Sequence, residues 1–127
     1  MNLEDFDDGR ETICAISSPS GIGGIAIVRL SGSGAISIAE KMVRLRSKRQ
    51  LRAMKSWSAA LGDIVSFNNE TVDEAVILLM KGPMSYTGED IVEIQCHGGV
   101  LVAEKVVSTA LKHGARPAAA GEFTKRA

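Results

Sequence analysis

The 127-residue chain carries 15 basic and 15 acidic side chains, and 45% of its residues are hydrophobic. This length and composition predict one folded domain with a single core and argue against a disordered chain. No apolar run approaches the roughly 20 residues that cross a bilayer, and the acidic residues 1–8 do not form an export signal, so we expect a cytoplasmic protein without a membrane segment.

Secondary structure is predicted from apolar periodicity and turn residues. Ser33 is the expected N-cap of the first helix, and the turn 68–71 predicts a hairpin, so the sheet is at least partly antiparallel. The pattern predicts an α/β (α+β) fold in two layers, a mixed sheet with helices on one face. In chain order we expect strands at 13–16 and 24–30, a helix at 34–43, strands at 57–67 and 74–80, a connector at 81–90, a strand at 91–96, a helix from 100 that ends at Gly114, and a short edge strand at 116–118.

Two cysteines lie alone in apolar runs. Cys14 and Cys96 have no CxxC spacing, which favours buried thiols over a disulfide. Cys96 and His97 suggest a metal ligand or a nucleophile, but zinc needs about four ligands and neighbouring strand residues face opposite sides. A structural role is favoured, in which His97 anchors the turn into the next helix, where free N–H groups can hold an anion.

Two further segments invite ligand hypotheses. The glycines of residues 20–24 lead into a strand, and the chain contains no Gly-Lys-Ser/Thr sequence, so a nucleotide phosphate loop is not favoured there. Residues 41–55 carry seven cations and no acid. This run either contacts phosphates or is a solvated helix end followed by a loop; the second reading is favoured because the run has no aromatic residue to stack on a base.

Arg29 and Glu93 are the candidate site residues. Each follows an apolar Ile-Val pair in a predicted strand, where an unpaired charge is costly. They pair with each other as a structural salt bridge, or they bind a polar ligand through a guanidinium fork and a carboxylate that accepts two N–H donors. The residues alone leave these alternatives even, and no catalytic residue or metal ligand is predicted.

Three long motifs occur in a fixed order over most of the chain. They are TICAISSPSGIGGIAIVRLSG (12–32), GPMSYTGEDIVEIQCHGG (82–99) and GEFTKRA (121–127). With these motifs, residues 11–127 resemble the N-terminal domain of the MnmE (TrmE) family of tRNA-modification GTPases. The resemblance implies a domain that dimerises and binds a tetrahydrofolate derivative, 5-formyl or methylene, in a fold similar to that of glycine-cleavage T-proteins.

The resemblance also implies site residues and a larger parent. Arg29 and Glu93 match two folate-contacting positions, and a third contact, a lysine, is expected beyond residue 127. We expect residues 1–127 to be the N-terminal domain of a longer chain, with 121–127 starting the connection to a helical domain. GTP, Mg²⁺ and K⁺ would bind only in the missing domains, so GTP hydrolysis is implied for the parent alone. With the flavoprotein MnmG, the parent would add an aminomethyl-type group to the wobble uridine of tRNA. The alternative is a stand-alone RNA-binding module that uses residues 41–55.

Overall fold

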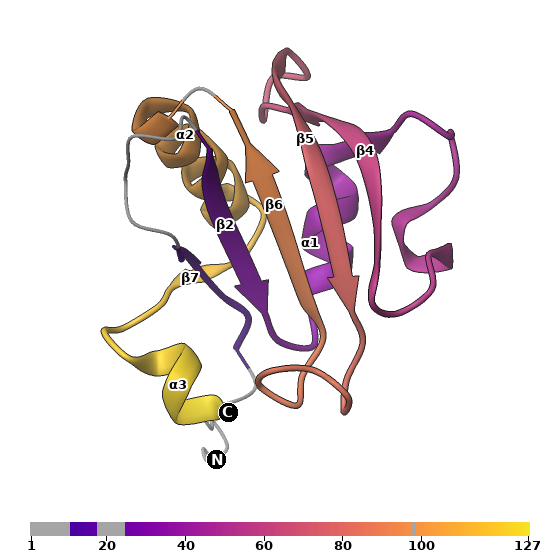
Figure 1. Ribbon diagram of the computed structural model, residues 1–127. Coiled ribbons are helices and arrows are strands. Elements are labelled where there is room, and N and C mark those ends of the chain that lie inside the picture. Colours follow the sequence, from indigo (N-terminus) through magenta and orange to yellow (C-terminus); the bar gives the residue numbers. More distant parts are fainter. Residues whose placement is uncertain (1–10, 18–24, 98) are drawn as a thin grey trace.

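The computed structural model describes residues 11–17, 25–97 and 99–127, and these form one sheet with two helices behind it (Figure 1). The sheet has the strand order β3-β4-β5-β6-β2-β1-β7. Its neighbouring strands pair antiparallel, except that β1 and β7 are parallel. The described strands are β1 (Ile13–Ile16), β2 (Ala26–Ser31), β3 (Val43–Leu45), β4 (Ser58–Val65), β5 (Thr71–Met80), β6 (Ile91–Cys96) and β7 (Arg116–Pro117). The helices are α1 (Ala35–Met42), α2 (Gly99–Lys112), α3 (Glu122–Arg126) and a 3-10 turn, η3 (Leu51–Ala53). The predicted fold class is confirmed.

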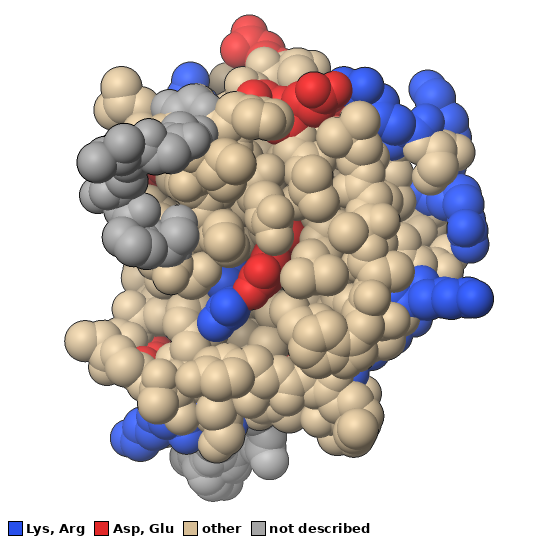
Figure 2. Space-filling model, in the orientation of Figure 1, with Lys and Arg blue, Asp and Glu red and all other residues tan. Residues whose placement is uncertain are grey.

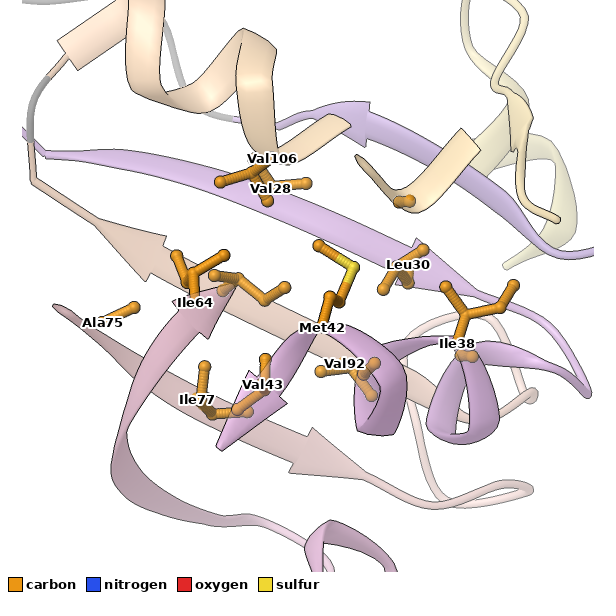
Figure 3. Packing of buried hydrophobic residues seen from close by; sticks show 14 of the residues in the cluster. Val28, Leu30, Ile38, Met42, Val43, Ile64, Ala75, Ile77, Val92 and Val106 are labelled. Carbon is orange, nitrogen blue, oxygen red and sulfur yellow. The ribbon is translucent and has the colours of Figure 1, made fainter. Parts of the chain in front are cut away.

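The core lies between the sheet and the pair α1 and α2 (Figure 3). Val28 and Leu30 of β2 and Met42 and Val106 of the two helices are fully buried in it. Each such side chain contributes about 1.5–3 kcal/mol by leaving water. Because side chains alternate along a strand, burial of Val28 and Leu30 against the helices turns Arg29 to the opposite face. We call that opposite side of the sheet the open face.

The predicted hairpin is confirmed with shifted ends. β4 begins at Ser58, because Trp57 has a φ of 63° that a strand cannot continue. The Ser66 hydroxyl accepts the N–H groups of Asn68 and Glu70, at 3.2 Å each, and closes the turn. β5 therefore starts at Thr71, three residues earlier than the pattern indicated.

The start of α1 differs from the prediction. Gly34, and not Ser33, is the N-cap, and it has no side-chain cap. The Gly34 N–H instead donates to the hydroxyl of Thr12, at 2.8 Å. A Cβ built on Gly32 would lie 2.6 Å from the Thr12 Cα, so only glycine allows this approach. The cap comes from a residue far away in the chain, which a local pattern cannot indicate.

Residues 41–55 contain more regular structure than predicted. A helix end followed by a loop was expected, but α1 stops at Met42 and the chain continues as the edge strand β3. Val43 and Leu45 are buried and Arg44 is exposed, which is strand alternation. Val43 fits the helical spacing equally well, so the change from helical to strand periodicity could not be recognised at this residue. η3 then brings buried Leu51 against the core.

The remaining elements agree with the pattern. α2 ends two residues before Gly114, and the short strand expected at 116–118 is β7, which covers 116–117. Residues 122–126 form the short helix α3, at the start of the segment expected to lead into a helical domain. Cys14 and Cys96 are free, buried thiols, as predicted. The glycine-rich segment 20–24 lies outside the described residues.

Candidate functional site

Arg29 and Glu93 lie side by side on the open face. They are directly opposite in the antiparallel pairing of β2 with β6. Arg29 Nε and Nη2 donate to Glu93 Oε2 at 2.8 and 2.5 Å. In Figure 2 a patch of mixed charge lies over β2 and β6, at the centre of a largely uncharged surface. The salt bridge between Arg29 and Glu93 that the sequence allowed is therefore present.

Each side chain of the pair keeps an unused polar atom. Glu93 is 7% exposed, yet both bonds from Arg29 go to Oε2, and Oε1 has no hydrogen-bond partner among the described residues. Arg29 Nη1 is likewise left without an acceptor there. A buried acceptor without a partner costs about 1–3 kcal/mol. A ligand that donates to Oε1 would remove this cost.

Apolar and aromatic groups surround the pair. Ala15 is opposite Arg29 on β1, and Leu78 is opposite Glu93 on β5. The Arg29 guanidinium carbon lies 5.5 Å from the ring centre of Tyr86 and 5.6 Å from that of Phe123. Contacts of this kind stabilise a cation by about 0.5–1 kcal/mol when exposed and more when desolvated.

Sequence reasoning missed the two rings. Tyr86 belongs to the 81–90 connector and Phe123 to α3, and both come from motifs that were used only for the resemblance. Their rarity is a usable signal, because aromatic side chains make up only 4% of the chain. Two of them in short motifs that contain glycine are candidates for packing against a flat ligand.

Ion pairs hold α3 against the end of the sheet. Arg126 is 8% exposed and donates to Glu89 in the 81–90 connector and to Glu122 in α3, both at 3.0 Å. Arg116 at β7 pairs with the same Glu122. The hydroxyl of Ser31, at the end of β2, donates to Glu89 at 3.0 Å. This network fixes the position of Phe123 relative to Arg29.

The network changes the titration of its central carboxylate. Hydrogen bonding from Arg116 lowers the pKa of Glu122 to about 2, and the Ala119 N–H and Arg126 act in the same direction. Glu122 therefore stays ionised through the whole neutral and mildly acidic range.

The 81–90 connector is fixed at both ends. The Gly82 N–H donates to Asp90 Oδ1 at 2.9 Å, and the Trp57 indole donates to the Met84 carbonyl at 2.7 Å. A Cβ on Gly82 would lie 2.6 Å from the Gly88 carbonyl oxygen, so this loop closes only with glycine there. The Tyr86 hydroxyl lies 3.3 Å from the Thr124 hydroxyl and links the connector to α3.

Cys96 and His97 do not form a dyad. Cys96 faces the core, whereas His97 lies outside it, with its N–H donating to Asp73 at 2.6 Å and its Nδ1 3.0 Å from the Glu74 carbonyl oxygen. His97 thus anchors the turn between β6 and α2, as predicted, and it does so through contacts with β5 that were not predicted. Burial raises the pKa of the Cys14 thiol to about 12, which leaves it unreactive. Within the described residues, no cluster of three or more potential metal ligands occurs, and no helix is long and apolar enough to cross a membrane.

Comparison with known proteins identifies the family. A family model described as "GTP-binding protein TrmE N-terminus" matches residues 12–127. The chain belongs to the TrmE N-terminal family. Its relatives include proteins named tRNA modification GTPase MnmE from Symbiobacterium thermophilum, 50% identical over 94% of this chain, and Sulfurimonas denitrificans, 47% identical over 93%. The relative of the same name from Fervidobacterium nodosum is 46% identical over 100% of the chain.

The match to these TrmE relatives covers only part of each of them. The chain spans 26%, 25% and 28% of the three relatives, or about a quarter of their length. The family assignment therefore rests on nearly all of this chain, while three quarters of each relative has no counterpart in it.

Proposed function

We propose that this TrmE-family chain is the tetrahydrofolate-binding and dimerisation domain of a tRNA-modification GTPase. The observation that carries the proposal is the unpartnered Oε1 of Glu93, buried beside a guanidinium that also has a free N–H donor. This arrangement suits a ligand edge that presents donors and an acceptor together. A reduced pterin has such an edge, with several N–H donors beside one carbonyl.

The residues present fit that group. Glu93 accepts ligand N–H groups through Oε1, and Arg29 donates through Nη1 to the pterin carbonyl or to a carboxylate of the glutamate tail. Ala15 and Leu78 beside the pair are apolar, so less water competes for the polar atoms of Arg29 and Glu93. The hydrogen bonds from these atoms to a ligand are therefore stronger. Tyr86 and Phe123 offer ring faces for a flat ligand. When bound, the 5-formyl or methylene folate would supply the one-carbon unit.

Dimerisation is proposed from the apolar part of the open face. Leu61 and Val76 are a cross-strand pair on β4 and β5, and they are 42% and 38% exposed. Trp57, just before β4, is 59% exposed. Exposed apolar side chains on a sheet face favour association, and a two-fold axis would bring the same patch from two copies together.

The proposal for the parent protein follows the relatives' name. Residues 1–127 form its N-terminal domain, and 121–127 lead into a helical domain. GTP, Mg²⁺ and K⁺ bind in the domains that follow, which hydrolyse GTP. The parent acts in the cytoplasm with the flavoprotein MnmG and modifies the wobble uridine of tRNA.

Two measurements test the proposal. Titration of 5-formyltetrahydrofolate into the chain by calorimetry should give saturable binding, with GTP as a ligand that does not bind. Sedimentation should give a dimer that Val76→Glu dissociates. Leu101→Glu, at a residue of α2 that is 78% exposed, adds the same charge elsewhere and should leave the dimer intact. Absence of folate binding at millimolar ligand would refute the cofactor assignment, and a wild-type monomer would refute dimerisation.

A further inference from the structure

A basic strip follows one edge of the sheet, away from the proposed folate site. It consists of the seven cations of residues 41–55 and runs from the end of α1 through β3 to the residues after η3. Its members are Lys41, Arg44, Arg46, Lys48, Arg49, Arg52 and Lys55. Figure 2 shows blue side chains along the rim beside β4, with little red between them.

Most of the strip is not neutralised. Arg46 pairs with Asp63 and Glu74, and Arg52 pairs with Glu40. The other five cations form no ion pair within the described part of the chain. Seven cations against three carboxylates leave an excess of four positive charges.

The backbone that carries these cations is ordered. The Arg46 N–H donates to the Leu61 carbonyl at 3.0 Å and extends the pairing of β3 with β4. The Lys48 N–H closes a turn onto the Leu45 carbonyl, also at 3.0 Å, and buried Leu51 ties η3 to the core. The free cations are therefore presented at defined positions.

A cleft lies within the strip. It has a volume of about 580 Å³, and its lining includes Arg44, Lys48 and Arg49. Two carboxylates, Glu40 and Asp63, also line it, but each is paired with a strip arginine. Burial lowers the pKa of His113, the residue that follows α2, and the charges of Lys41 and Arg44 lower it further.

We infer that the basic strip binds the phosphate backbone of an RNA. An extended row of unpaired cations matches a polyanion better than a single small phosphate, and its affinity comes from released counterions. The exposed large apolar side chains of the described residues all lie outside 41–55, so the strip lacks the apolar anchors of a membrane-binding surface. Relatives of this chain are named for tRNA modification, which makes RNA the polyanion to test.

This inference is independent of the folate proposal. β3 is separated from β6 by β4 and β5, and neighbouring strands lie about 4.8 Å apart, so β3 is about 14 Å from the strand that carries Glu93. Substitutions on the strip leave the Arg29–Glu93 pair untouched, and the two ideas can fail separately.

The test compares two double variants with equal charge change. Lys48→Gln with Arg49→Gln removes two exposed strip cations, whereas Lys105→Gln with Lys125→Gln removes two exposed cations elsewhere. An unmodified tRNA transcript is titrated by fluorescence anisotropy from 50 to 200 mM KCl. Each phosphate contact contributes about 0.7–0.9 to the slope of log affinity against log salt. The strip variant should lower the slope by about 1.5 and weaken binding about tenfold or more at 100 mM KCl.

The control pair should stay within about twofold of wild type, and both pairs should keep the wild-type melting temperature and 5-formyltetrahydrofolate affinity. Equal weakening by the two pairs would mean that net charge alone acts, and the strip would lose its role. A wild-type slope below about 1, or binding to phosphatidylserine vesicles as tight as to tRNA, would also overturn the inference.

Discussion

Replacing Glu93 by Gln keeps the shape of the side chain but exchanges one carboxylate oxygen for an N–H₂ donor. In the wild-type chain Oε2 accepts both bonds from Arg29, and Oε1 is the acceptor proposed for the ligand. The amide can satisfy only one of these demands. If its oxygen faces Arg29, its N–H₂ group faces the ligand's own donors.

The expected loss of affinity follows from that mismatch. Leaving a buried ligand donor unpaired costs about 1–3 kcal/mol, so folate affinity should fall about tenfold or more. Stability should also fall, because Arg29 loses its counter-ion. Arg29 is 24% exposed and lies against two rings, so the cost is about 1–2 kcal/mol, less than for a fully buried pair. That corresponds to about 4–8 °C in melting temperature.

Calorimetric titration of 5-formyltetrahydrofolate and a thermal melt measure the two effects separately. Glu74→Gln is the matched control, since Glu74 pairs with Arg46 at an exposed position on β5. The control should change neither quantity appreciably, because exposed ion pairs contribute little. Unchanged folate affinity in Glu93→Gln together with a lowered melting temperature would refute the ligand role and leave a purely structural salt bridge.

Three further outcomes are expected. The chain alone should not turn over GTP above a blank, because it contains neither Gly-Lys-Ser/Thr nor Asn-Lys-x-Asp to position phosphates and the base; phosphate release measures this. The pKa of Glu122 is lowered to about 2 in the folded chain, so its stabilisation is complete above pH about 4.5 and lost as the pH falls towards 2. Melts from pH 7 to 3 should therefore show a loss that Glu122→Gln reduces. Cys14 and Cys96 should resist a thiol reagent at pH 8 until denaturant is added, because burial raises the pKa of both thiols.

Local pattern was sufficient for most of the architecture. The hairpin turn and the apolar stripe of α2 are built from neighbouring residues, so periodicity and turn chemistry predicted both, although the turn was expected at 68–71 and the strands are joined by residues 66–70. β3 was not predicted, because this three-residue edge strand directly follows α1 and Val43 fits both the helical and the strand periodicity. The Thr12 cap of α1 was not predicted because the hydroxyl comes from a residue 22 positions earlier in the chain, just before β1.

The site was predictable only in part, for a similar reason. Two charges in apolar strands indicated that Arg29 and Glu93 need partners, and register brings them together. The positions of Tyr86 and Phe123 depend on the connector 81–90 and on α3. No local sequence pattern in these two segments indicates that they lie near β2. Their approach depends on Arg126, whose ion pairs to Glu89 and Glu122 are contacts between distant segments.

The molecule uses its charged side chains in different ways, and the contrast bears on Glu93. Arg126 is 8% exposed and donates to Glu89, to Glu122 and to the Glu11 carbonyl, so it holds segments together. Glu93 is equally buried but forms no such link, since it bonds one cation on the adjacent strand through a single oxygen. The sheet would hold β2 and β6 together without that side-chain contact, because the backbone pairing of the two strands includes five residue pairs besides Arg29 and Glu93. A buried carboxylate that links nothing further and keeps an oxygen free is better explained by a ligand than by stability.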